Sequence, residues 1–198
     1  MDIDLFHTKI RISPVALIIF ALIFYIVDIT TFLAFILAAA VHELGHIAAI
    51  KALGFKFDRL TFGIFGLCID YSGAAPELYH GAAALAGPIA GIILAYALSA
   101  LSNYFISDFP ELASGMSLMF SLFNLLPVLP LDGGRILLSF FSYIFGYARG
   151  LRAAGWVSAA AAFSIFAVGL ILSIKGRGAA VLLFSFCLLA ELYIEKVL

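Results

Sequence analysis

Two histidines and a glutamate lie close together in an apolar stretch, in the segment VHELGHIAA at residues 41–49. His42 and His46 are four residues apart, so on a helix of about 3.6 residues per turn they share one face and can bind one cation. Glu43 lies beside that face, where a carboxylate can act as a general base. This spacing is typical of zinc metalloproteases. The alternative is a polar cluster that only forms hydrogen bonds between helices. The stretch is apolar enough to lie in a membrane, however, and ionisable side chains in a membrane are usually functional.

A second unusual stretch, FNLLPVLPLDGGR, covers residues 123–135. Pro127 and Pro130 cannot donate backbone hydrogen bonds, and each favours extended geometry in the residue before it. We therefore expect residues 124–131 to leave the helix. Such backbone is tolerated at membrane depth only where it is buried in protein or lines a wet cavity. The stretch therefore predicts a polar site at that depth.

Asp132 follows the two prolines and is the candidate third ligand, because a catalytic zinc usually has three protein ligands. A carboxylate on a dication avoids the cost of an isolated buried charge. We expect Gly133 and Gly134 to form a tight turn that directs Asp132 inward. The alternative is that Asp132 only caps the N-terminus of the following helix. Asp132 lies three residues before Arg135, and His46 lies shortly before Lys51, and these positions indicate a site near the cytosolic side.

The composition indicates the protein class that must position these residues. The chain has 198 residues, of which 65% are hydrophobic and 12% charged, and its mean hydropathy is +1.17. Soluble domains are roughly half apolar and a quarter charged. We predict an all-α polytopic membrane protein with a single domain over residues 1–198. The net charge of −1 gives no indication of a nucleic acid partner.

Membrane-spanning helices need roughly 20 apolar residues. Six segments fit this pattern, at residues 12–27, 32–51, 80–101, 112–129, 153–174 and 179–196. Residues 136–147 are too few to span alone, so we expect a broken continuation of the fourth span or an interfacial helix. The distribution of Lys and Arg places both termini in the cytosol, although Lys175 and Arg177 fall on the other side.

Two further patterns concern packing. Residues 55–72 alternate in part between apolar and polar types, with glycines at turn positions, so a small membrane-associated β-hairpin is expected after the second span. The third span carries Ala83, Gly87 and Gly91 at intervals of four, and such small residues let helices approach closely. We interpret these three residues as serving packing only, and we expect Pro88 to bend this helix.

The motifs taken together resemble a known family. HELGH in an apolar span, AGP at residues 86–88 and NLLPVLPLDGG at residues 124–134 are similar to the site-2 protease family of intramembrane zinc metalloproteases. The short basic N-terminus and the lack of a PDZ insertion resemble the stage IV sporulation protein FB branch. Members of that branch cleave the membrane-associated precursor pro-sigma-K. The CBS domain that often follows in that branch is not in this sequence, so regulation by nucleotide sensing is not expected.

The resemblance implies roles for five residues. His42, His46 and Asp132 would bind one Zn²⁺ per chain, and Glu43 would be the general base. Asn124 would help bind the substrate or stabilise the oxyanion. The implied substrate is a membrane-associated protein, either pro-sigma-K or another such as an anti-sigma factor. The hairpin at about residues 57–71 would hold it by strand addition, and we expect inhibitory or regulatory membrane protein partners.

Two other classes of function use the same residues. A multi-pass metal transporter would need ligands repeated along a path, and the sequence contains one cluster. A metal-stabilised scaffold that binds a partner without cleaving it would not need Glu43. Cleavage, zinc flux and stoichiometric capture of a partner are the measurements that distinguish the three.

Overall fold

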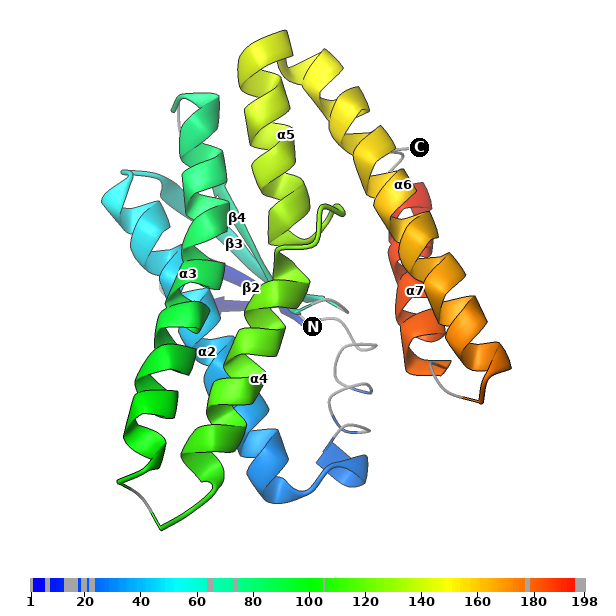
Figure 1. The fold of residues 1–198 in the computed structure, drawn as a ribbon. Coiled ribbons are helices and arrows are strands. Elements are labelled where there is room, and N and C mark those ends of the chain that lie inside the picture. Colours follow the sequence, from blue (N-terminus) through cyan, green and yellow to red (C-terminus); the bar gives the residue numbers. More distant parts are fainter. Residues whose placement is uncertain are drawn as a thin grey trace. The chain divides into compact units, whose positions relative to one another are not determined.

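The computed structural model describes residues 2–5, 8–12, 18, 21, 24–63, 66–72, 75–104, 106–176 and 179–194 (Figure 1). Its contacts divide the chain into two compact units. The first comprises Met1–Ala75 and Ala86–Phe123, and the second comprises Pro76–Leu85 and Asn124–Leu198. The architecture is predominantly helical, and a small sheet belongs to the first unit.

Helix α2, Ile29–Ala52, has well-defined signals at both ends. The backbone N–H and the hydroxyl of Thr31 donate to the carboxylate of its N-cap residue Asp28, at 3.0 and 2.7 Å. These two hydrogen bonds hold the pKa of the exposed Asp28 carboxyl below its ordinary value. At the other end, Gly54 has a φ of 77°, and the N–H of Phe55 donates to the carbonyl of Ile50. This glycine stop turns the chain toward the sheet.

The sheet has four strands in the order β1-β2-β3-β4. Strands β3, Lys56–Gly63, and β4, Gly66–Ser72, form an antiparallel pair within the segment expected to contain two strands. Strands β1, Asp2–Leu5, and β2, Thr8–Ile12, form a second antiparallel pair, and β2 lies parallel to β3. The sequence interpretation missed β1 and β2, although DIDL and TKIRI alternate polar and apolar residues in the manner of strands.

Helices α3, Glu77–Ser102, and α4, Phe109–Asn124, run side by side in the first unit from Ala86 onward (Figure 1). Serine hydroxyls of α4 connect the two helices. Ser114 donates to the carbonyl of Ala95 at 2.7 Å, and Ser117 donates to that of Gly91 at 2.8 Å. Each hydroxyl therefore has an acceptor inside the protein, as polar groups at membrane depth require.

The second unit contains α5, Asp132–Phe145, α6, Tyr147–Ile174, and α7, Ala179–Ile194. Helix α6 packs on both α5 and α7 (Figure 1). Gly146, with a φ of 80°, separates α5 from α6. Most of the segment 136–147 therefore belongs to α5, a separate helix that follows the break after α4. Ser139 of α5 donates to the carbonyl of Glu77 and accepts from the N–H of Gly81 at 3.0 Å, which ties the start of α3 to α5.

The proline-containing segment between α4 and α5 leaves the helix after Asn124, as its sequence predicts. Its backbone is compact and internally bonded: the N–H of Val128 donates to the carbonyl of Leu126, and that of Leu131 to Val128. Val128 is fully buried, and the N–H of Leu129 donates to the hydroxyl of Ser158 on α6, at 3.1 Å. Ser158 therefore satisfies a backbone group that neither lipid nor the segment itself could satisfy.

Among the described residues, three helices are long and apolar enough to cross a membrane: α2, α3 and α6. They correspond to the predicted spans 32–51, 80–101 and 153–174, and they support an integral membrane protein. Helices α4 and α7 have 16 residues each, or about 24 Å at 1.5 Å per residue, which is less than the roughly 30 Å core of a bilayer. The predicted span 12–27 lies largely outside the described residues. The structure thus does not support the count of six spans.

We expect Ser158→Ala to destabilise the protein, because it leaves the buried N–H of Leu129 without its partner. The loss of a buried hydrogen bond partner costs about 1–3 kcal/mol. Unfolding in detergent micelles measures this cost. Ser164→Ala is the matched control on the same helix, since the Ser164 hydroxyl is exposed and bonds only to the carbonyl of Ala160. Equal stability of the two variants would contradict the role given to Ser158.

Candidate metal centre

One face of α2 is buried along most of its length. Its buried residues recur every four positions: Ala34, Ala38, His42, His46 and Ile50. The two histidines thus continue a stripe of small or apolar residues that packs inside the protein. Leu44 between them is 59% exposed, whereas His42 is 2% and His46 9% exposed.

The imidazoles of His42 and His46 meet through their ligating edges. The two Nε2 atoms are 3.1 Å apart, and the ring planes are nearly perpendicular, at 79°. Ligand atoms at about 2.0–2.1 Å from a tetrahedral zinc lie roughly 3.3–3.4 Å from each other. The histidine pair therefore has nearly the spacing of two nitrogen ligands of one ion.

Asp132 is the first residue of α5 and is 8% exposed. The N-cap residue is Leu131, so the alternative in which Asp132 caps this helix is wrong. The expected tight turn at the two following glycines is also wrong, because both are helical. A Cβ on Gly133 would overlap the carbonyl of Leu125, and one on Gly134 would lie 2.5 Å from the carbonyl carbon of Val128. The glycines are small so that the segment before α5 can fold against its first turn.

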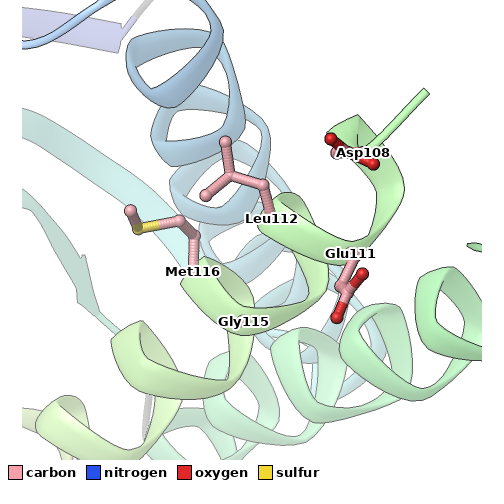
Figure 2. Close-up of a pocket in the computed structure, with 5 residues that line it drawn as sticks. All are labelled: Asp108, Glu111, Leu112, Gly115 and Met116. Atoms are coloured by element: carbon pink, nitrogen blue, oxygen red, sulfur yellow. The ribbon is translucent and has the colours of Figure 1, made fainter.

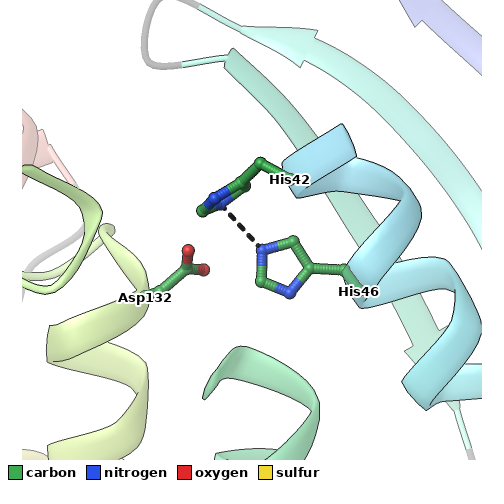
Figure 3. Close-up of side chains that lie close together, drawn as sticks. All are labelled: His42, His46 and Asp132. Atoms are coloured by element: carbon green, nitrogen blue, oxygen red, sulfur yellow. Dashed lines mark hydrogen bonds between the residues drawn. The ribbon is translucent and has the colours of Figure 1, made fainter. Parts of the chain in front are cut away.

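His42, His46 and Asp132 each offer one ligand atom, and these atoms all lie within 4.8 Å of one another. Figure 3 shows the carboxylate and the two imidazoles directed toward a common point. Two nitrogens and a carboxylate oxygen are a donor set that zinc accepts. The three residues are thus positioned to bind a metal ion, and within the described part of the chain this is the one such group.

Two other site residues were predicted, Glu43 and Asn124. Glu43 follows His42 on α2 and is half-buried. Asn124 is the last residue of α4, also half-buried, directly before the proline-containing segment.

Phe120 of α4 is a contact that the sequence interpretation did not identify. Its ring meets that of His42 edge to face, with centroids 4.9 Å apart at 86°, and it packs on Phe35 of α2 in the same manner. Such pairs are worth roughly 0.5–1.5 kcal/mol beyond their buried area. One aromatic among twenty phenylalanines carries no signal in a single sequence.

A second group of acidic residues lies elsewhere in the first unit. Asp108 and Glu111, at the start of α4, line a shallow hollow together with Leu112, Gly115 and Met116 (Figure 2). Both acids are exposed, and the rest of the lining is apolar.

Comparisons with known proteins agree with this geometry. The sequence model described as Peptidase family M50 matches residues 100–168. A zinc metalloprotease of Methanocaldococcus jannaschii is 32% identical over 147 residues, which are 71% of this chain and 42% of that protein. Stage IV sporulation protein FB of Bacillus subtilis is 31% identical over 138 residues, which are 68% and 48% of the two chains. The chain thus spans less than half the length of these two relatives.

The fold has a counterpart among solved structures. The site-2 protease from Methanocaldococcus jannaschii superposes with a TM-score of 0.74 at 24% identity, over 94% of this chain and 90% of that one. The fold and the metal-binding group therefore define a polytopic membrane protein with the site-2 protease fold. The family expected from the motifs is confirmed: the chain contains a peptidase family M50 domain of the site-2 protease type.

We expect Asp132→Asn to lose zinc, because a neutral amide replaces the negatively charged ligand at nearly unchanged size. The measurement is the zinc content of the purified protein, with affinity from competition with a chelator. Asp108→Asn is the matched control, since it makes the same change in the exposed acidic group. Zinc retained at one ion per chain in Asp132→Asn, or lost equally in both variants, would contradict the assignment.

Proposed function

We propose that the chain is an intramembrane zinc metalloprotease that hydrolyses a peptide bond of a membrane-associated protein. The observation that carries the proposal is the convergence of His42, His46 and Asp132 on one point, with a glutamate directly beside His42 in an apolar helix long enough to cross a membrane. The zinc metalloproteases among its relatives support the same activity. Residues 1–198 act as one protease domain in this account.

The zinc ion, when bound, supplies Lewis acid polarisation of the attacking water and of the scissile carbonyl. Glu43 is the general base: its carboxylate takes a proton from water as the water oxygen bonds to the carbonyl carbon. The carbon–nitrogen bond then breaks, and Glu43 gives the proton to the leaving amine. Glu43 lies three residues before His46 on α2, so it neighbours the ligand face without being part of it.

Asn124 and the β-hairpin complete the proposed site. The Asn124 amide N–H donates to the substrate carbonyl oxygen as negative charge develops there. Helical substrates keep their carbonyls bonded, so the substrate has to unwind before it is cleaved. Strand β4 lies at one edge of the described sheet, where an extended substrate segment can pair with it. We propose that this hairpin is membrane-associated.

The side of the membrane follows from the basic residues. Lys51 lies in the last turn of α2, shortly after His46, and Arg135 lies in the first turn of α5 with Asp132. Positively charged residues favour the cytosolic face, so cleavage takes place near that face, and both termini are cytosolic. Membrane proteins that block access to the site would regulate the enzyme.

The relatives indicate the class of substrate, a membrane-associated protein, and two candidates belong to this class. The likeness to stage IV sporulation protein FB supports processing of pro-sigma-K during sporulation. The alternative within the same activity is another membrane-associated substrate such as an anti-sigma factor. The observed convergence of three ligands on one point favours either of these over a metal transporter, which needs ligands along a path.

We expect Glu43→Gln to keep zinc and lose proteolysis, because the amide cannot accept the proton of the attacking water. General base catalysis contributes about 10²- to 10⁴-fold to the rate. Cleavage of a candidate substrate in liposomes, measured with zinc content, checks both effects. His42→Ala should lose zinc and activity together, and Glu111→Gln, the control at an exposed acid, should change neither. Unchanged cleavage by Glu43→Gln would eliminate the mechanism.

We expect co-expression with pro-sigma-K to yield a shortened sigma factor that is absent with the Glu43→Gln variant. Gel mobility and mass spectrometry of the product measure this cleavage. An anti-sigma factor with a transmembrane segment serves as the parallel substrate. Cleavage of the latter alone would exclude the sporulation role and leave the protease activity standing.

A further inference from the structure

The structure assigns Gly87 of α3 a role beyond packing: we propose that it is a positioning residue for the His46 imidazole. A Cβ built on Gly87 would lie 2.5 Å from Cε1 and 2.7 Å from Cδ2 of His46, and closer still to Nε2. Carbon atoms in favourable contact are about 3.5–4.0 Å apart. The ligating edge of the imidazole therefore occupies the space that any other residue would fill with its side chain.

The atom most affected is the one that binds the metal. His46 Nε2 faces His42 Nε2 at 3.1 Å, and it is also the His46 atom nearest to the added Cβ. A methyl group at position 87 would force the ring out of its present position. The histidine pair would then lose the spacing that suits one ion.

Helix α3 is close to α2 at the neighbouring turn as well, so moving α3 away to make room would break this packing. A Cβ on Gly45 of α2 would lie 2.6 Å from the carbonyl oxygen of Ala86 and 2.7 Å from Cβ of Ala90. Pro88, next to Gly87, is fully buried. The two helices are thus closely packed at Gly45, the residue directly before His46.

Backbone conformation does not account for the glycine. Gly87 lies within α3 and is not among the glycines with positive φ, and glycine is a poor helix former. Helix propensity alone therefore predicts that Gly87→Ala stabilises α3. The contact with His46 predicts that the same substitution weakens metal binding. The two explanations therefore predict opposite effects of Gly87→Ala, a gain in helix stability or a loss of metal affinity.

The test compares Gly87→Ala with two alanine substitutions at other glycines. A Cβ on Gly91, one turn further along α3, would overlap the Ser121 hydroxyl but meets no histidine, and one on Gly115 of α4 meets nothing within 4 Å. The readouts are Co²⁺ affinity, from chelator competition, and the visible absorption of the Co²⁺-substituted protein. We expect Gly87→Ala to lower affinity about 10- to 100-fold, as loss of ligand orientation typically does, and to change the spectrum.

Both controls should keep the affinity and spectrum of the unchanged protein. Wild-type affinity and spectrum in Gly87→Ala, or equal losses in Gly87→Ala and Gly91→Ala, would overturn the proposal. If Gly87→Ala folds poorly, the stability of the double variant Gly87→Ala/His46→Ala is compared with that of His46→Ala. Equal stability of these two variants is expected, because the ring that the methyl group meets has been removed. A lower stability of the double variant would show that the methyl group clashes with another group and would overturn the proposal.

This inference rests on the metal site of the proposed protease and not on its activity. Failure of the proposed function would appear as absent cleavage with normal metal binding. Failure of the role of Gly87 would appear as normal metal binding in Gly87→Ala.

Discussion

Two imidazole nitrogens 3.1 Å apart on a buried face of a long apolar helix are the interaction on which the rest of the structure depends. A metal ion held there brings charge into a region of low dielectric, where an uncompensated charge is costly. The carboxylate of Asp132 supplies opposite charge within 4.8 Å. The irregular segment before Asp132 then has to be accommodated, because backbone that leaves a helix at membrane depth needs internal partners. The hydroxyl of Ser158 is one such partner.

Small residues in the surrounding helices make this arrangement possible. Gly45 allows α2 and α3 to approach, Gly133 and Gly134 allow the proline-containing segment to fold against α5, and Gly150 allows α6 to contact the backbone of Ser142. None of these glycines has the positive φ that requires glycine. Their common property is the missing Cβ, which lets backbone or a functional ring come closer than a side chain would permit.

The sequence predicted which three residues come together as a possible metal site, because metal chemistry restricts residue type and spacing. His42 and His46 were predicted from their spacing of about one helical turn. Asp132 was predicted because it follows two prolines in an apolar segment, where a carboxylate without a partner is costly. The sequence predicted the supporting contacts poorly. Phe120 is one of 20 phenylalanines and Ser158 one of 14 serines, and only the fold brings them to His42 and Leu129. The N-terminal strands were missed because their basic residues were interpreted as the flank of a membrane span.

The most direct measurement is X-ray absorption at the zinc edge of the purified, zinc-loaded protein. The account predicts a first shell of nitrogen and oxygen only, at about 2.0–2.1 Å, with the outer-shell scattering of two imidazoles. The same spectrum for Asp132→Ala should keep both imidazole signals if any zinc remains bound. A sulfur neighbour at about 2.3 Å, or scattering from fewer than two imidazoles in the unchanged protein, would contradict the proposed ligand set.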